Sequence, residues 1–418
     1  MRSGSYFKKD TCRICESSTL KKVVELTPTP PGNNFLYEDQ IGTQEKEYPL
    51  ELHFCHKCFH IQLGHVVDPS FLFQNHYSYV SGTSPVFVEH LKIYADYIVG
   101  LFNIKQSSLI VDIGSNDGTC LSLFKELGMD VLGVDPASEI AEIAVSRGID
   151  TISDFFSLSL AKQIKAKHGK ANLITSHNAC AHIDDLGGVI SGVEILLKNE
   201  GVFVMEVGYF VDVFENKWFD TIYHEHVDYH TVAPLEKLFD RCNMELIRVE
   251  RVSPQGGSIR VIAQKQNGPY KKDNTVSELV TLEENLGLTK ADTLIDFDNQ
   301  ISEVRDKFQQ LIQTIKNDGK RIAAFGAATK ATTLCYHFQI DKNDIDFIVD
   351  DNPLKQGVYS PGKHIPVCAP DIIYSEKPDY LVILAWNFAD AIMKKHKAYI
   401  ELGGSFILPM PDPIIVNN

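Results

Sequence analysis

The stretch "SLIVDIGSNDG", residues 108–118, decides which fold this chain is expected to have. It is a short apolar run that ends in a turn containing Gly114 and Gly118, and the following "TCLSLFKELG" has helical periodicity. A second apolar run, "MDVLGVDP", ends in Asp135. A strand, a glycine turn, a helix and a strand that ends in an acid form a β-α-β unit of the nucleotide-binding kind.

The residues of this turn indicate which cofactor the unit binds. A dinucleotide fingerprint is G-x-G-x-x-G, but the second glycine position here is Asn116, and Asp112 ends the first strand. This pattern resembles a site for S-adenosylmethionine (SAM) more than a site for NAD. Gly114 and Gly118 allow a ligand to approach the backbone closely, and Asp135 lies where a carboxylate accepts ribose hydroxyls.

Further apolar runs extend the same sheet. "ANLITSHNA" (171–179) and "GVFVMEVG" (201–208) are predicted strands, and "LIRVERV" with "GGSIRVIAQK" is a predicted antiparallel pair. A parallel sheet finished by a hairpin is typical of class I SAM methyltransferases. Asn178 and His182 are expected at the ligand-binding edge of this sheet. Asp154 and Phe155 are candidates to contact an adenine, although Phe155 is equally well interpreted as a core residue.

The cysteines near the N-terminus indicate a metal. "TCRICES" and "HFCHKCFH" each contain a C-x-x-C pair, and the remaining five of the nine cysteines are scattered. A closed site of four thiolates suits structural zinc, and the alternatives are ordinary thiol turns or a redox motif. The predicted ligands are Cys12, Cys15, Cys55 and Cys58.

A second α/β unit is predicted near the C-terminus. "KRIAAFGAATKATTLCYHF" is a strand, a turn with Gly326 and a helix, and "IDFIVDDNPLKQG" is a strand that ends in Asp350 and Asp351. A helix N-terminus with Lys330 on its first turn is a natural cradle for phosphate. This unit is therefore expected to be Rossmann-like.

Composition narrows the class of protein. The chain has 418 residues, 44% of them hydrophobic and 23% charged, which is ordinary for globular proteins with more than one core. Its formal net charge of -15 disfavours nucleic acid as a partner. The N-terminus lacks the apolar core of a signal peptide, and no apolar run has the roughly 18 residues that span a bilayer. A cytoplasmic protein without membrane partners is expected, and a monomer is assumed.

Two other segments hold candidate functional residues. "TIYHEHVDYH" (221–230) carries three histidines with acids and tyrosines, and by itself it fits a metal site, an acid–base site or a wet surface loop. "NHYSYVSGTSPVFVEH" (75–90) either caps a substrate site or packs between domains.

Together these segments resemble one family, the nucleotide-sugar C-3′-methyltransferases, which act on 4-keto-deoxysugars linked to nucleoside diphosphates. The resemblance covers essentially the whole chain. The segments that carry it are "CRIC", "CHKC", "YSYVSGTS", "VDIGSNDGT", "HNACAHIDDL", "YHEHVDYH", "GGSIRV", "GAATKATTL" and "VDDNPLKQGVYSPGKHIPV".

The resemblance implies an α/β protein with a small zinc-binding domain, a SAM-binding Rossmann-like domain and a C-terminal Rossmann-like domain that helps to hold the nucleotide sugar. The expected limits are residues 1–75, 76–268, 319–418 and, for a helical connector, 269–318. The implied acid–base residues are Tyr223, Glu225, His226, His182 and a tyrosine that is either Tyr77 or Tyr79, of which Tyr79 is preferred. The implied substrate-binding residues are Gly257, Ser258, Arg260, Gly326, Lys330, Asp351, Lys355 and Tyr359.

The chemistry of this reaction assigns roles to the histidine segment. A carbon–carbon bond needs a carbon nucleophile, and a C-4′ ketone makes the hydrogen at C-3′ acidic. Histidine suits the base because its ordinary pKa lies near neutrality. We therefore expect His226 to be the base, Glu225 and Tyr223 to orient it or the sugar, and His182 to support the enolate. His224 and His230 are expected to be structural.

Three other classes of protein remain as alternatives. An O- or N-methyltransferase would need no enolate. An NAD oxidoreductase would need a better glycine fingerprint than either unit has. A zinc-bearing interaction protein would need neither α/β unit. The sequence does not distinguish a thymidine diphosphate (dTDP) from a guanosine diphosphate (GDP) substrate.

Overall fold

The computed structural model describes residues 6–73 and 79–417. Tyr77, one of the two tyrosines considered for the active site, lies outside the described residues. Within them, no helix is both long enough and apolar enough to cross a lipid bilayer.

The N-terminal segment forms antiparallel sheet around the cysteine pairs. Its elements are β1 (Tyr6–Lys8), β2 (Leu20–Thr29), β3 (Tyr48–Cys55), β4 (Ile61–Leu63), β5 (His65–Val67) and α1 (Pro69–Phe73). Strands β2, β3 and β4 make one sheet, and its fourth strand is β11 (Asp228–Tyr229), which comes from the histidine segment. The histidine segment is therefore built into the sheet of the cysteine-bearing unit.

The central unit is a seven-stranded sheet with the strand order β12-β13-β10-β9-β6-β7-β8. Its strands are β6 (Leu109–Ile113), β7 (Asp130–Val134), β8 (Thr151–Ile152), β9 (Ala171–His177), β10 (Leu197–Gly208), β12 (Met244–Val252) and β13 (Ser258–Lys265). Strand β13 pairs antiparallel with β10 and β12, and all other pairs are parallel. The parallel sheet finished by a hairpin, predicted for a class I SAM methyltransferase, is confirmed.

Helices surround this central sheet. They are α2 (Pro85–Phe102), α3 (Thr119–Glu126), α4 (Ser138–Ser146), α5 (Leu158–His168), α6 (Leu186–Leu196), α7 (Phe210–Asn216) and α8 (Val232–Arg241), with short 3₁₀ turns η3 (Cys180–His182) and η4 (Phe219–Thr221). Helix α2 begins at Pro85, where the Oγ of Ser84 accepts the N–H of Phe87 and proline occupies a first-turn position that lacks a partner anyway.

The C-terminal unit is a six-stranded sheet with the order β16-β15-β14-β17-β18-β19, parallel except for β19. Its elements are β14 (Ile322–Phe325), α11 (Thr329–His337), β15 (Ile348–Val349), β16 (Val367–Cys368), α12 (Ile372–Glu376), β17 (Tyr380–Ile383), α13 (Ala389–Lys395), α14 (Lys397–Glu401), β18 (Ser405–Leu408) and β19 (Ile414–Val416). The predicted Rossmann-like architecture is present here too.

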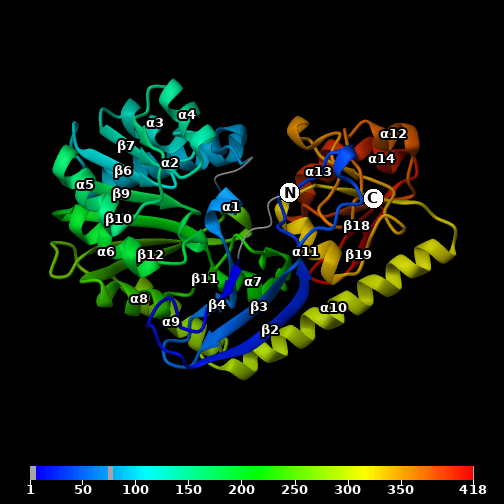
Figure 1. Cartoon of the computed structure of the whole chain (residues 1–418), viewed down its shortest axis with the longest axis horizontal. Coiled ribbons are helices and arrows are strands. Elements are labelled where there is room, and N and C mark those ends of the chain that lie inside the picture. Colours follow the sequence, from blue (N-terminus) through cyan, green and yellow to red (C-terminus); the bar gives the residue numbers. More distant parts are fainter. Residues whose placement is uncertain (1–5, 74–78, 418) are drawn as a thin grey trace.

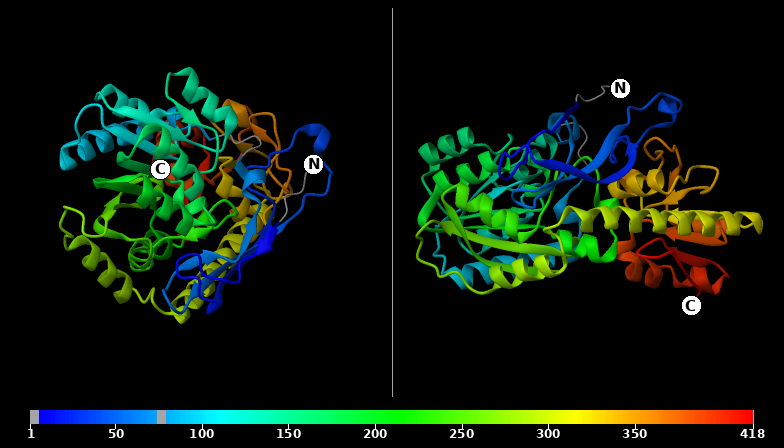
Figure 2. Two further views of the ribbon diagram at one scale, coloured as in Figure 1. Left: turned by 60° about the vertical axis from the view of Figure 1, so that its left-hand side comes forward. Right: turned by 90° about the horizontal axis from the view of Figure 1, so that it is seen from below.

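Two helices connect the α/β units, α9 (Thr275–Asn285) and α10 (Ala291–Asn317). Buried apolar residues recur along α10 at helical spacing: Leu294, Phe297, Ile301, Val304, Phe308, Ile312 and Ile315. Such a stripe buries one face of the helix, and α10 lies along β2 and runs from the central unit to the C-terminal unit (Figures 1 and 2).

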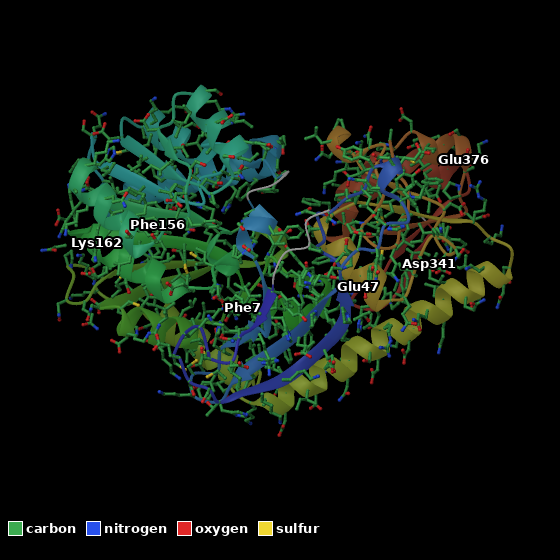
Figure 3. The ribbon with its side chains drawn as sticks, in the orientation of Figure 1. Phe7, Glu47, Phe156, Lys162, Asp341 and Glu376 are labelled. Carbon is green, nitrogen blue, oxygen red and sulfur yellow. The ribbon has the colours of Figure 1, made fainter. Side chains whose placement is uncertain are left out.

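The two α/β units lie side by side above the N-terminal strands and α10 (Figure 1). Lys162 of α5 and Glu376 of α12 mark their outer ends (Figure 3). The histidine segment contacts both α/β units, because the backbone N–H of Val227 donates to the carbonyl of Ala181 in the central unit while the hydroxyl of Thr333 on α11 donates to the carbonyl of Ile222.

Candidate active site

The two C-x-x-C pairs meet in space. The sulfur of Cys12 lies 3.4 Å from that of Cys58, and the sulfur of Cys15 lies 3.5 Å from that of Cys55. All four sulfurs lie within 4.8 Å of one another. These distances exceed the roughly 2.0 Å of a disulfide and approach the separation of about 3.8 Å between thiolates around tetrahedral zinc. The donor set therefore fits one structural zinc ion, with no position left for a substrate.

The backbone of the turn after β6 has a conformation and a close packing that favour glycine and asparagine. Gly114 has φ +74°, and a Cβ there would lie 2.5 Å from the Cβ of Ala179. Asn116 and Asn178 also have positive φ, +51° and +55°, which asparagine tolerates better than most residues. The carboxylate of Asp135 accepts the backbone N–H of Asn116 at 2.8 Å, so it holds the turn and keeps lone pairs for hydroxyl groups.

The side chain of Asn116 positions the segment that carries Tyr79. Its Oδ1 accepts the backbone N–H of Ser81 at 2.8 Å, and its Nδ2 donates to the carbonyl of Tyr79 at 3.0 Å. Tyr79 and Ser81 line the same cavity as the glycine turn. Of the two interpretations of this segment, the structure thus favours a cap on the site.

His226 is held in one tautomer by its neighbours. Its Nδ1 lies 2.9 Å from the carbonyl of Thr221, which can only accept, so Nδ1 carries the hydrogen. Its Nε2 is then the acceptor for the hydroxyl of Tyr223 at 2.8 Å. Burial, and next the nearby His182, lower the pKa of His226 to about 3. The imidazole is therefore neutral at physiological pH.

His182 faces His226 from the loop after β9. The two ring centroids lie 5.0 Å apart, and His182 Nδ1 donates to the carbonyl of Glu225 at 2.7 Å. Burial lowers the pKa of His182, and this backbone bond opposes the shift. The two neutral imidazoles thus lie side by side in the cavity, where each can accept or donate a hydrogen bond.

Hydrogen bonds link the carboxyl of Glu225 in the histidine segment to the N-terminal unit and to the C-terminal unit. Asn33 Nδ2 donates to Glu225 Oε1 at 2.8 Å, and Asn33 Oδ1 accepts the hydroxyl of Thr329 at 2.7 Å. Burial raises the pKa of Glu225 to about 7, against the opposing effects of Asn33 and Lys355. Glu225 is therefore poised to exchange a proton near neutrality.

Two lysines face the cavity from the C-terminal unit. Lys330 Nζ donates to Asn387 Oδ1 at 2.8 Å and lies 3.5 Å from the ring centroid of Trp386, whose Nε1 donates to Asp220. Burial lowers the pKa of Lys330 to about 8. Lys355 Nζ donates to the carbonyl of Ala327 at 2.7 Å, and burial lowers its pKa as well. Neither ammonium forms an ion pair within the described residues, so both suit an anionic ligand.

One cavity of about 680 Å³ unites these groups. It is lined by the five implied acid–base residues that the structure describes, His182, Tyr223, Glu225, His226 and Tyr79. It also takes in the predicted cofactor residues Gly114, Asn116, Asp135, Phe155 and Asn178, and the predicted substrate residues Gly257, Lys330 and Lys355. Phe155 is 36% exposed, which excludes its interpretation as a core residue. Its volume lies within the range of roughly 300–1,000 Å³ that ligand-binding pockets have.

Three predicted cofactor residues lie outside the cavity lining. Asp112 is buried inside the strand end, where burial and Asp135 raise its pKa. Gly118 is the residue before α3, and a Cβ there would lie 3.1 Å from the side chains of Ala144 and Ile149, so its lack of a side chain allows close packing at this point. Asp154 is exposed, and its carboxylate accepts the next backbone N–H.

Five predicted substrate residues also lie outside the lining. Arg260 lies across neighbouring strands and donates to Glu206 of β10 at 2.7 Å and to Glu250 of β12 at 3.1 Å, and these carboxylates offset the cost of burying the guanidinium. The others have local roles: Ser258 donates to a backbone carbonyl, Gly326 makes room for Ala385, Asp351 pairs with Lys395 at the surface, and Tyr359 bridges to Leu36 through its backbone. A direct substrate contact by these five stays a prediction, and the structure gives each of them a partner within the protein.

Several lining residues were missed by the sequence analysis. Asn33, Trp218, Thr329 and Asn387 are among them. Asn33 follows a turn-rich stretch about 190 positions before its partner Glu225, and nothing in the local pattern links the two. Thr329 precedes Lys330 at the start of α11, and the phosphate-cradle interpretation of that helix could have included it.

Comparison with known proteins identifies three parts of the chain. Residues 12–73 match the family model of a zinc binding domain, residues 87–249 that of a methyltransferase domain, and residues 253–411 that of the C-methyltransferase C-terminal domain. The chain is similar to C-methyltransferase NovU of Streptomyces niveus, with 34% identity over 408 residues that cover 98% of this chain and 97% of the relative.

The solved structures that resemble part of this chain have lower sequence identity to it than NovU has. The PH0226 protein of Pyrococcus horikoshii has 13% identity and a TM-score of 0.37 over 45% of this chain and 95% of that one. A magnesium protoporphyrin IX methyltransferase of Synechocystis with bound SAM has 14% identity and a TM-score of 0.33 over 43% of this chain and 82% of that one. The assignment rests on the family models and NovU: the chain belongs to the family of SAM-dependent C-methyltransferases that carry an N-terminal zinc-binding domain.

Proposed function

We propose that this C-methyltransferase transfers the methyl group to C-3′ of a 4-keto-6-deoxysugar that is linked to a nucleoside diphosphate. The observation that carries the proposal is the single cavity in which the glycine turn of β6, the histidine segment and the lysines of the C-terminal unit meet. The cofactor would bind at the glycine turn, the ketosugar at the histidine segment and the diphosphate at the lysines.

The diphosphate end is supported by charge and by helix geometry. Lys330, Lys355 and the N-terminus of α11 all face the cavity, and the first backbone N–H groups of a helix lack partners within the helix. Lys330 is held by an aromatic face and an amide, so a phosphate does not need to displace a carboxylate. A diphosphate bound here would anchor the sugar beside His226.

The histidine segment supports the carbanion chemistry. His226 Nε2 is unprotonated at physiological pH. Once Tyr223 turns its hydroxyl hydrogen away from the Nε2 lone pair, Nε2 can take the C-3′ proton while the bonding electrons move through C-3′ and C-4′ to the ketone oxygen. The protonated Nε2 then donates to the oxygen of Tyr223 and frees the phenol hydrogen for the enolate oxygen. Burial opposes the imidazolium, and the adjacent enolate charge favours it.

The other residues position the reactants. When bound, SAM supplies the electrophilic methyl group. Glu225, oriented by Asn33, lies next in sequence to His226 and is placed to bond the sugar or the base. His182 stands beside His226 and can donate to the enolate oxygen or relay its proton. Tyr79 closes the same cavity.

The proposal is tested with a panel of dTDP- and GDP-linked 4-keto-6-deoxysugars, incubated with the protein and SAM in heavy water and analysed by mass spectrometry. We expect one added methyl group and deuterium incorporation at C-3′ for one member of the panel. The same experiment identifies the nucleotide. Methyl gain on oxygen or nitrogen without exchange at C-3′ would contradict the proposal and favour an O- or N-methyltransferase. A cytoplasmic monomer remains part of the proposal.

A further inference from the structure

Arg13 lies in the zinc-binding unit, yet its side chain reaches the back of the active site. It stands between Cys12 and Cys15, and its side chain is completely buried. Its Nε donates to Asp184 at 2.9 Å and lies 3.9 Å from Asp228. A buried guanidinium between two carboxylates is costly to place and has strong effects on the position of its partners.

The two carboxylates belong to the two loops that carry the histidines. Asp184 follows His182 by two residues, and Asp228 follows His226 by two residues. Both acids line the cavity. Without Arg13, two like charges would face each other behind the histidine pair and push the loops apart.

Arg13 is itself fixed by the cysteine-bearing unit. Its backbone N–H donates to Gln62 Oε1 at 2.9 Å, and its Nη1 donates to the carbonyl of Leu63 at 2.9 Å. Strand β4, which contains both residues, pairs with β11, and His60 Nε2 lies 2.7 Å from the carboxylate of Asp228. The position of the guanidinium is thus determined by the turn that holds the zinc.

We propose that Arg13 is a positioning residue that sets the separation of His182 and His226, so that the zinc-binding unit acts on proton removal through it. The two loops also meet directly, where the backbone N–H of Val227 donates to the carbonyl of Ala181 at 2.8 Å. This bond is the reporter of their spacing. The measurement of reaction rates rests on the proposed function, whereas the measurement of hydrogen exchange at the Val227 amide does not.

The experiment compares Arg13→Gln and Asp184→Asn with wild type and with the control Lys9→Met. Lys9 also pairs with Asp184, at 2.9 Å, but it does not bridge the loops. For each zinc-loaded protein the zinc content, the SAM affinity, the rate of deuterium incorporation at C-3′, kcat and the hydrogen exchange of the Val227 amide are measured.

We expect Arg13→Gln to lower the incorporation rate and kcat together by roughly 100-fold, with SAM affinity and zinc content unchanged, because a displacement of about 1 Å costs that much. Asp184→Asn should lower both rates by about tenfold, since it keeps an acceptor and loses the charge. Lys9→Met should remain within about twofold of wild type. The double variant Arg13→Gln/Asp184→Asn should be no slower than Arg13→Gln alone.

Unchanged incorporation and unchanged Val227 exchange in Arg13→Gln with full zinc would overturn the inference. If Arg13→Gln loses zinc, Asp184→Asn decides instead, because Asp184 is remote from the cysteines in sequence, and wild-type rates there would overturn the inference. If wild type incorporates no deuterium from any substrate, the proposed function has failed, and faster Val227 exchange in both variants would still establish the positioning role.

Discussion

At the edge of the central sheet, Asp135 accepts the backbone N–H of Asn116 at 2.8 Å and that of the residue two positions after itself at 2.9 Å. At the edge of the C-terminal sheet, Asp350 accepts the backbone N–H of Ala327 at 2.7 Å and again that of the residue two positions after itself at 2.8 Å. Both units thus use an acid at the end of the second strand to hold the turn after the first.

The glycines of the two turns also correspond. A Cβ on Gly114 would lie 2.5 Å from the Cβ of Ala179, and a Cβ on Gly326 would lie 2.4 Å from the Cβ of Ala385. Both have positive φ, +74° and +102°, which only glycine adopts without strain. The backbone of both edges is therefore determined by the same steric requirement.

The edges differ in charge. Among residues 6–73 and 79–417, Lys330 and Lys355 are the lysines and arginines that line the cavity, and both belong to the C-terminal unit. We infer from this difference that the shared turn provides a binding edge, whereas side chains of the segments that follow it, such as Lys330 at the start of α11, determine which ligand it takes. This separation of roles leads to four predictions.

The strongest test removes the base between the two edges. His226→Asn should lower turnover and deuterium incorporation at C-3′ by about 1000-fold or more, because general base catalysis contributes on the order of 10²- to 10⁴-fold. Affinity for SAM and for the nucleoside diphosphate should not change, since each edge is intact. Calorimetric titration and the mass-spectrometric assay measure both. Near wild-type turnover would rule out His226 as the base.

The second test removes charge from one edge. Lys330→Met should weaken binding of dTDP or GDP by roughly 10- to 100-fold, since charge-assisted bonds to phosphate are lost, and it should leave SAM binding unchanged. In wild type, diphosphate affinity should fall as the pH rises through about 8, where Lys330 loses its proton, and this dependence should disappear in the variant. Equal loss of both ligands would show that the edges are not independent.

The third test compares the two turn-holding acids. Asp135→Ala should weaken SAM binding by about tenfold and spare the diphosphate, and Asp350→Ala should do the reverse, because each change leaves two backbone N–H groups without their acceptor. Titration of both ligands into both variants gives the four affinities needed. If either variant affects the opposite ligand, the correspondence between the edges is superficial.

The smallest effect concerns Glu225, where the units meet. Its pKa is raised from 4.5 to about 7 in the folded protein, so between these values the unfolded chain has lost a proton that the folded chain keeps. This group therefore lowers the free energy of unfolding as the pH rises from about 4.5 to about 7, by up to about 3 kcal/mol.

Glu225→Gln should remove that slope, so its stability relative to wild type should increase over the same pH range. Denaturant unfolding at pH 5 and pH 7.5 measures the difference. The control Glu139→Gln changes an exposed glutamate of α4 and should show no such trend. A stability difference between Glu225→Gln and wild type that does not vary with pH would contradict the raised pKa.

The sequence by itself determined the two α/β units, the four cysteine ligands and the family resemblance. These depend on signals confined to short stretches: apolar periodicity, glycine at turns, C-x-x-C spacing and an acid at a strand end. For the same reason Gly114, Asn178 and Lys330 could be assigned to the sheet edges that line the cavity, whereas His226 was assigned through the family resemblance.

Only the tertiary structure decided which residues meet across long separations. Asn33 joins Glu225 to Thr329, and Arg13 joins Asp184 to Asp228, through hydrogen bonds and ion pairs that no local period encodes. The sequence also did not predict which way side chains within the motifs point. Arg260 and Asp351 lie in segments that carry the family resemblance, but Arg260 pairs with the buried Glu206 and Asp351 pairs with Lys395 at the surface. Burial and the nearest opposite charge determine that direction, and both arise only when the units pack together.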